Sequence, residues 1–159
     1  AELSAVTGRS VRVCGMLQDQ AYWDHVAAQH SAATLEYQGF VPTDQLQAEL
    51  GCCAALVMTP KWVEAFGNVA IEAMATGVPV ITYDRGGPAE IVVDGVTGFV
   101  TAPDDVDALA LAVNRIGEID RKHCRQRVDA EYSSAAMAGR VTRWLTEVLD
   151  ASRRAELSH

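Results

Sequence analysis

The amino-acid sequence predicts an α/β domain in which a parallel sheet is covered by helices on both faces. Short apolar runs rich in β-forming residues alternate with longer stretches of helical periodicity, which is the order expected when helical crossovers join parallel strands. The chain has 159 residues, of which 49% are hydrophobic and 21% are charged. This length and composition are sufficient for one domain with its own core.

The expected strands are short apolar runs, each followed by a turn residue or a helix signal. They cover residues 11–15, 35–39, 55–59, 79–83 and 98–101.

The expected helices lie between these strands and after the last one. Residues 2–8 are the end of a first helix, and residues 19–28 form the next. Pro42 opens the following helix, residues 43–50, with Thr43 as its cap before Asp44. Further helices are expected at residues 66–76 (ended by Gly77 and Pro79), 88–93, from Asp104 or Asp105 to about 116, 120–131 and 133–151.

Charge and cysteine content limit the classes of partner. The net charge of −8, from 21 acidic and 13 basic residues, argues against nucleic acid and anionic membranes, since both select clustered Lys and Arg. The four cysteines lack zinc-ligand spacing and the density of a secreted disulfide framework, so a reduced, cytoplasmic protein is expected. No apolar run predicts a transmembrane segment. The basic residues that do cluster are interpreted as a solvated helix face: Arg121, Lys122, Arg125 and Arg127.

The segment between the third and fourth expected strands is the one that indicates chemistry. The loop from Pro60 leaves the carboxyl end of a parallel strand and enters a helix, which is where the ligand crevice of such a sheet lies. The first turn of that helix offers unpaired N–H groups and a positive dipole end to an anion such as a diphosphate. Gly67 allows close approach to the backbone. The residues of this turn are Phe66, Gly67, Asn68 and Val69.

Two carboxylates flank this helix start. Glu64 precedes it and can accept hydrogen bonds from sugar hydroxyls, whereas Glu72 lies about one and a half turns inside and can reach a vicinal diol. Each acid alone also fits a simpler role, because Glu64 can complement the helix dipole and Glu72 can be a solvated helix residue. Together with Gly67 and the strand–loop–helix context, the two acids favour a ligand site.

The run EAFGNVAIEAMATGVPVI, from Glu64 to Ile81, resembles the E-x(7)-E signature of glycosyltransferase family 4. It continues as RGGPAEIVVDGVTGFV at residues 85–100, which is similar to that family's Gly-Gly loop, acidic helix and D-G-x-T-G turn. It begins earlier with GFVP at residues 39–42. The resemblance covers about residues 11–144 and implies the C-terminal, donor-binding half of a GT-B fold.

The resemblance implies roles for individual residues. Glu64, as the catalytic residue, would contact the donor sugar hydroxyls, and Glu72 would contact the ribose hydroxyls of the nucleotide. The backbone of residues 66–69 would hold sugar oxygens and diphosphate. The main chain near Phe40, Val41 and Pro42 would lie beside the base, and Gly86, Gly87 and Glu90 would shape the crevice floor. A Gly-Gly-Pro turn entering a helix needs no ligand, so both interpretations of the two glycines stay open.

The resemblance also implies a reaction. A hexosyl group would be transferred from a nucleotide diphosphate sugar with retention, without a cofactor and without a metal for donor binding. The runs KWVEAFGNVAIEA and RGGPAEIV look closest to UDP-glucose-dependent glucosyltransferases, including those that act on pterins, so UDP-glucose is the expected donor. The nucleotide-sugar-binding domain is expected over residues 1–132 and a C-terminal helical tail over residues 133–159. The sequence does not indicate the acceptor.

Two parts of the family pattern have no counterpart in these residues. The family opens this domain with a strand that bears Gly-Arg and soon afterwards a Lys, which neutralise the leaving diphosphate. Arg9 follows Gly8 but lies directly before the strand at 11–15 and lacks the downstream Lys. In the family's sheet the missing strand is central, so we expect a gap that another chain or segment fills. Val11 directly beside Ala55 would refute this. The amino-terminal acceptor domain is also missing, and the chain alone is expected to be inactive.

Three other functions compete with this interpretation. One alternative is a binding or assembly module that has lost catalysis, and the retained acids weigh against it. A nucleotide-sugar epimerase-like domain shares the sheet and fits the E-x(7)-E pattern less well. A dinucleotide-binding oxidoreductase does not fit, because no G-x-G-x-x-G follows the strand at 11–15.

Overall fold

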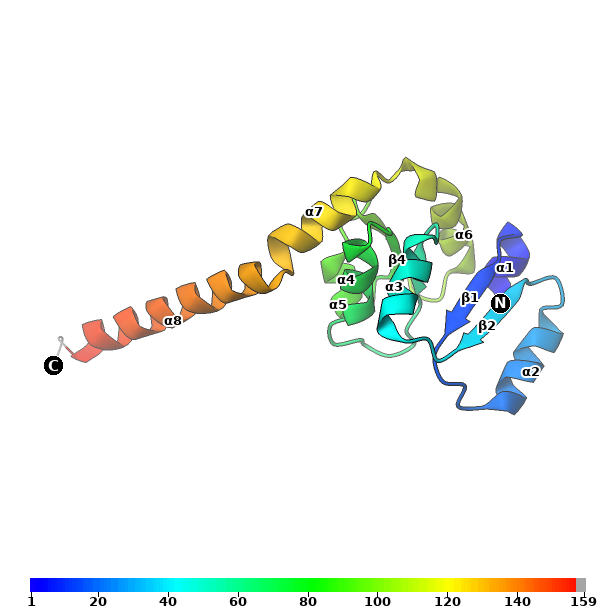
Figure 1. Ribbon diagram of the computed structural model, residues 1–159, viewed down its shortest axis with the longest axis horizontal. Coiled ribbons are helices and arrows are strands. Elements are labelled where there is room, and N and C mark those ends of the chain that lie inside the picture. The colour runs from blue at the N-terminus through cyan, green and yellow to red at the C-terminus, as the bar shows by residue number, and fades with distance from the viewer. Residues whose placement is uncertain (157–159) are drawn as a thin grey trace.

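The strands form two parallel sheets rather than one in the computed structural model, which describes residues 1–156 (Figure 1). In the first sheet β1 (Val11–Cys14) pairs with β2 (Leu35–Gly39). The second has the order β3-β4-β5, formed by β3 (Leu56–Met58), β4 (Val80–Tyr83) and β5 (Gly98–Thr101). Over the described residues no ladder joins β1 to β3. The α/β prediction and the expected gap between these two strands are confirmed.

The helices lie close to their expected positions. Before β4 they are α1 (Glu2–Thr7), α2 (Gln20–Gln29), α3 (Thr43–Gly51) and α4 (Asn68–Ala75). After β4 they are α5 (Gly87–Ile91), α6 (Val106–Arg115), the 3-10 turn η1 (Ile116–Glu118), α7 (Arg121–Glu131) and α8 (Ser134–Glu156).

The helix ends show which local signals were reliable. Asp105 caps α6 by accepting from the N–H of Ala108, as expected, and Gly77 follows α4 with φ of 78°. The predicted Thr43 cap is wrong. Pro42 occupies the N-cap position of α3 with an extended ψ of 148°, so Thr43 is already the first helical residue and no side chain caps the helix.

The core lies on the C-terminal side of the fold. All residues of β4 are buried, and the buried cluster continues into α4, α6 and α7. The side chains of β3 are only half-buried, and β1, β2, α2 and α3 contribute no buried residue. Among the described residues, β1 and β3 each have one edge without a strand partner, and their side chains are incompletely covered, which is unusual in a parallel sheet with helices on both faces.

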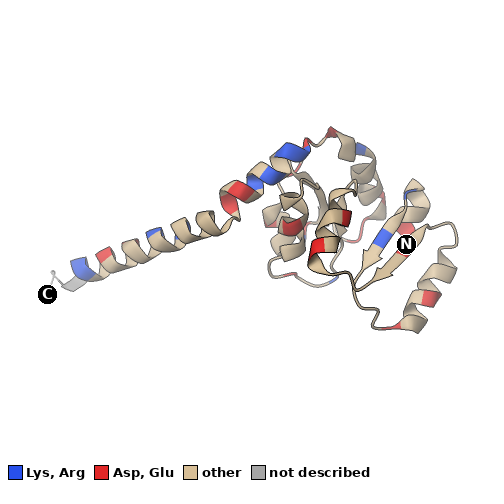
Figure 2. Ribbon diagram, in the orientation of Figure 1, with Lys and Arg blue, Asp and Glu red and all other residues tan. Residues whose placement is uncertain are grey.

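Three of the four basic residues on α7 (blue in Figure 2) are exposed, as expected for a solvated face: Arg121, Lys122 and Arg125. Arg127 is half-buried. Arg121, however, donates to the carbonyl oxygens of Gly51 (2.7 Å) and Cys53 (3.0 Å), so its charge lies at the C-terminal end of α3 and compensates that end of the helix dipole. The guanidinium of Arg127 lies 5.7 Å from the Tyr132 ring centroid.

Helix α8 extends away from the body of the domain (Figure 1). Its large apolar side chains recur at helical spacing and are exposed: Met137, Val141, Trp144, Leu145, Val148 and Leu149. None of the helices within residues 1–156 is both long enough and apolar enough to cross a membrane.

The four cysteines should differ sharply in reactivity. Cys14 and Cys52 are exposed, whereas Cys124 is fully buried, and burial raises its pKa from 9.0 to about 11. Because the thiolate is the reactive form, we expect maleimide at pH 8 to label Cys14 and Cys52 within minutes and Cys124 only after unfolding. Peptide mass spectrometry after labelling with and without urea measures this. Labelling of Cys124 in the folded protein at the rate of Cys52 would contradict the core described above.

Candidate functional site

The loops that leave the carboxyl ends of β3, β4 and β5 meet at one edge of the second sheet. The loop after β3 contacts the loop after β4, because Glu64 and Gly86 form an isolated parallel bridge and the N–H of Gly87 donates to the Glu64 carbonyl oxygen at 2.7 Å. Glu64 and the two glycines, separated in sequence, are therefore direct neighbours. This is the edge at which parallel α/β sheets place their ligands.

The two glycines are required by this close approach. A Cβ atom on Gly87 would lie 2.6 Å from the Cα and the carbonyl oxygen of Phe66. A Cβ atom on Gly86 would overlap the carbonyl oxygen of Glu64, and Gly86 also has φ of 77°, which favours glycine. The packing of the two loops therefore accounts for both glycines without a ligand. A contact between these glycines and the donor stays a prediction.

The carboxylate of Glu64 is oriented by a neighbouring aromatic side chain. The indole Nε1–H of Trp62 donates to Oε2 of Glu64 at 2.9 Å. Over the described residues Oε1 has no hydrogen-bond partner, and Glu64 itself is half-buried. One carboxylate oxygen is thus held in place while the other can accept a hydrogen bond from a ligand. Sequence reasoning missed Trp62, although its position two residues before Glu64 was a usable signal.

The N-terminus of α4 lies directly after this loop. Gly67 is the N-cap residue with φ of 91°, and a Cβ atom there would lie 2.7 Å from Cγ of Pro88. Phe66 therefore precedes the helix rather than forming its first turn, which corrects the predicted start. The first-turn N–H groups of Asn68 and Val69 have no partner within residues 1–156. They are free to bind an anion, as at other helix N-termini.

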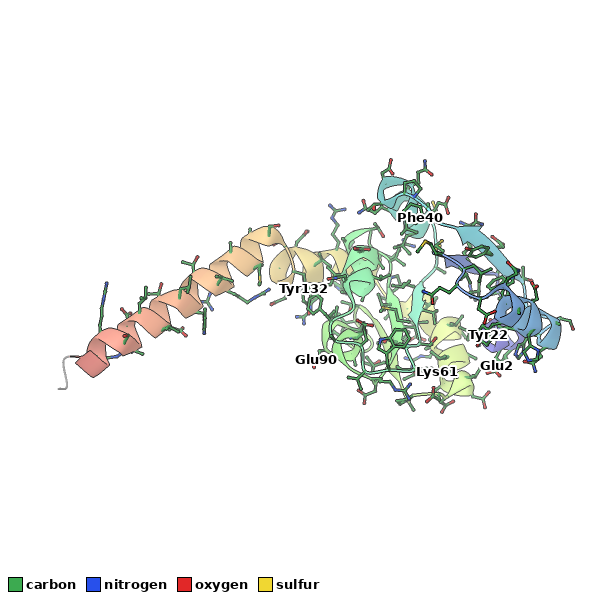
Figure 3. All side chains as sticks on the ribbon, turned by 90° about the horizontal axis from the view of Figure 1, so that it is seen from below. Glu2, Tyr22, Phe40, Lys61, Glu90 and Tyr132 are labelled. Atoms are coloured by element: carbon green, nitrogen blue, oxygen red, sulfur yellow. The ribbon has the colours of Figure 1, made fainter. Side chains whose placement is uncertain are left out.

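Glu72 is exposed on α4 and lines a cavity of about 360 Å³. The same cavity is lined by Asn68 and Phe66, whose ring meets that of Tyr132 edge-on at 6.4 Å between centroids. Its other wall comes from the junction of α7 and α8, where Tyr132 is seen in Figure 3. The lining residues that sequence reasoning missed are Ile71, Tyr132, Met137 and Arg140, and no local motif distinguished them.

Phe40, Val41 and Pro42 follow β2 in the first sheet. Phe40 is exposed, Val41 is half-buried, and no described hydrogen bond or ring contact joins the three to residues 64–72. Figure 3 shows Phe40 well apart from Lys61, which lies in the loop after β3. The sequence-predicted site residues therefore fall into two groups, one on each sheet.

Arg85 is a further residue that sequence reasoning missed. Its Nη1–H donates to the carbonyl oxygen of Pro60 at 2.8 Å, and its Nη2–H donates to Oδ2 of Asp104 at 2.6 Å. The guanidinium holds the pKa of Asp104 below its ordinary value, mainly through that hydrogen bond. One side chain thus connects the loops after β3, β4 and β5.

The D-G-V-T-G run at residues 94–98 has a structural role. Oδ1 of Asp94 accepts from the N–H of Val100, and Oγ1 of the buried Thr97 accepts from the N–H of Val93, both at 2.9 Å. Gly95 has φ of 71°. The motif therefore forms the turn that leads into β5, and its side chains are used in backbone hydrogen bonds.

The sequence matches one protein family and several known proteins. The family described as "Glycosyl transferases group 1" matches residues 6–146. The chain is 30% identical to the glycogen synthase of Mycobacterium tuberculosis over 138 residues, which are 82% of this chain and 33% of that protein. It is 36% identical to the alpha-1,3/1,6-mannosyltransferase alg-2 of Neurospora crassa over 109 residues, 64% of this chain and 23% of that protein.

Solved structures match the fold. The crystal structure of Anabaena HepE in complex with UDP superimposes with a TM-score of 0.77 at 20% identity, covering 91% of this chain and 44% of the other. HepE in complex with UDP-glucose superimposes with a TM-score of 0.74. The chain thus spans about a third or less of the length of the two curated relatives and under half of HepE.

Proposed function

This chain belongs to the glycosyl transferases group 1 family, and from that premise we propose that it is the donor-binding part of a retaining hexosyltransferase that uses UDP-glucose. The family and the GT-B architecture support a transferase with a nucleotide-sugar donor. The proposal has three finer parts: the sugar is glucose, its carrier is UDP, and the transfer retains configuration. The curated relatives include both a mannosyltransferase and a glycogen synthase, so the sugar requires a direct test.

The observation that carries the proposal is the start of α4. Free N–H groups of Asn68 and Val69 point out of a helix N-terminus, and the partial positive charge of that end favours a diphosphate. Glu64, with one carboxylate oxygen held by Trp62, lies just before the helix. Glu72 lies on the exposed face of the same helix. Two acceptors for hydroxyl groups therefore flank one anion site.

From these positions we assign separate roles to Glu64 and Glu72. Glu64, at the loop end of the site, would be the catalytic residue and would accept hydrogen bonds from the donor sugar hydroxyls. Glu72 would accept from the ribose hydroxyls, with the diphosphate held between them. The base would lie near Phe40, Val41 and Pro42 after β2. Gly86 and Gly87 would form the floor through the backbone that they hold in place.

The gap between the sheets supports a further part of the proposal. Within residues 1–156, β1 and β3 each have one edge without a strand partner. The side chains of β3 are half-buried, and those of β1 alternate between half-buried and exposed. We propose that a strand from another segment, or from another chain, completes the sheet there and that an acceptor-binding domain accompanies it. The cations that would neutralise the leaving diphosphate would come from those parts. The exposed free thiols Cys14 and Cys52 support a reducing, cytoplasmic compartment.

Calorimetric titration with UDP, GDP and ADP tests the donor site. In the intact protein we expect UDP to bind at least about tenfold more tightly than ADP or GDP, with the same affinity in EDTA because the proposed contacts need no metal. Tighter binding of UDP-glucose than of UDP-galactose would support glucose as the sugar. Failure of all three nucleotides to bind would exclude the donor site, and binding without transfer to any sugar acceptor would favour an assembly module.

A further inference from the structure

Arg85 lies at the crevice edge and is fixed from three directions. Its guanidinium donates to Pro60 in the loop after β3 and to Asp104 in the loop after β5, and it lies 5.8 Å from the Tyr83 ring centroid. Its side chain is 20% exposed, which is low for an arginine so close to an open edge. A surface arginine that only improved solubility would not need these partners.

The loop that contains Glu64 is held at both ends by residues of the segment 85–87. At its start, the buried Pro60 accepts a hydrogen bond from Arg85 at 2.8 Å. At its end, the carbonyl oxygen of Glu64 accepts from the N–H of Gly87 at 2.7 Å. Between these two points the side chains of Lys61, Trp62 and Val63 are exposed. The two anchors therefore determine the position of an otherwise open loop.

Asp104 completes the arrangement from the third loop. It has φ of 62°, an uncommon conformation for a residue other than glycine, and its carboxylate lies 2.6 Å from Nη2 of Arg85. Asp104 is itself exposed, so this pair adds little to stability on its own. The pair instead orients the guanidinium of Arg85. With Nη2 bound to Asp104, Nη1 faces the carbonyl oxygen of Pro60.

We propose that Arg85 is a positioning residue for Glu64, and that the Arg85–Asp104 pair sets the selectivity of the site for the sugar part of the donor. The proposal rests on the donor function proposed above. Movement of the loop at residues 60–64 displaces the Glu64 carboxylate, whereas the N-terminus of α4, anchored by Gly67 against Pro88, stays in place. Loss of Arg85 should therefore affect the sugar contact and spare the nucleotide.

The geometry requires arginine rather than lysine. The planar guanidinium presents two nitrogen donors in fixed directions, and here one is used for a carbonyl and the other for a carboxylate. A lysine can satisfy one partner at a time. Arg85→Lys should therefore recover only part of what Arg85→Ala loses.

Two measurements on the intact protein test the proposal. For Arg85→Ala we expect UDP affinity within about twofold of the wild type and UDP-glucose affinity lower by about tenfold, with Arg85→Lys between them. Amide hydrogen exchange of Gly87, whose N–H donates to the Glu64 carbonyl oxygen at 2.7 Å, should become about tenfold faster in Arg85→Ala. Arg115→Ala is the matched control, because Arg115 also has an acidic partner, Glu118, and an aromatic ring, Phe99, but lies at the end of α6.

The possible results distinguish failure of the positioning role from failure of the donor function. Equal weakening of UDP and UDP-glucose, or unchanged exchange of the Gly87 amide in folded Arg85→Ala, would overturn the positioning role. If Arg85→Ala does not fold, Asp104→Asn, a substitution at an exposed side chain, tests the same role. If the wild type binds neither UDP nor UDP-glucose, the donor function fails, and the exchange of the Gly87 amide still decides whether Arg85 holds the loop.

Discussion

Replacing Glu72 with alanine is expected to weaken UDP binding by about tenfold to a hundredfold, because hydrogen bonds to a charged acceptor contribute about 1.5–3 kcal/mol each. A ribose offers two adjacent hydroxyls to one carboxylate. Glu72 is exposed on α4 beside the free N–H groups of Asn68 and Val69, so the loss should appear without a change in folding. Titration calorimetry with UDP, together with a thermal melt of each variant, measures both quantities.

Glu64→Ala is the internal comparison for this prediction. It should leave UDP affinity within about twofold and remove most of the extra affinity of UDP-glucose over UDP, since in the proposed site its carboxylate would face the sugar rather than the ribose. Glu147→Ala, which removes an exposed acid from α8, controls for the change in net charge. Equal losses of UDP affinity in the Glu64 and Glu72 variants would show that the two acids share one role.

Much of the fold could be predicted because its signals are local. The bounds of β2 and β5 coincide with the expected ranges 35–39 and 98–101, and Asp105 caps α6 through a hydrogen bond to a residue three positions away. Gly77 ends α4 for an equally local reason. Thr43 shows the limit of such signals, because Pro42 took the cap position and moved the threonine into the helix.

The reasons for the glycines of the site could not be read locally. Gly67 is explained by Pro88, and Gly87 by Phe66, in each case a residue about twenty positions away. The sequence pattern indicated that glycine was needed near a ligand, whereas the structure assigns the close approach to the protein itself, the Pro88 ring at Gly67 and the Phe66 backbone at Gly87. Composition and spacing contain no information about which distant atom a Cβ would meet.

The partners of the site were missed for the same reason. Arg85 contacts Pro60 and Asp104, which lie 25 and 19 positions away along the chain, and Tyr132 reaches the cavity from the end of α7. Only tertiary folding brings these residues together. The resemblance placed the main chain near Phe40 beside the base of the donor. The structure shows Phe40 exposed after β2 in the first sheet, and its contact with the base stays a prediction.

Gly87→Ala is expected to destabilise the protein by about 2–4 kcal/mol. The added Cβ would lie 2.6 Å from Cα and the carbonyl oxygen of Phe66 and 2.7 Å from the carbonyl oxygen of Ala65. All three atoms belong to the backbone, so no side-chain rotation relieves the contact. Urea denaturation measures the free energy of unfolding, and a fall in the melting temperature of several degrees should accompany it.

Gly139→Ala is the control for this effect, because a Cβ there meets nothing within 4 Å and the residue lies inside α8. It should be neutral or raise stability by up to about 1 kcal/mol, since alanine favours the helix. Equal effects of the two substitutions would mean that the loops at residues 65–66 and 86–87 are not closely packed. If Gly87→Ala instead separates these loops without unfolding the domain, Glu64 loses its backbone anchor. UDP-glucose affinity should then fall before UDP affinity does, which connects the packing of the glycine loop to the selectivity of the site.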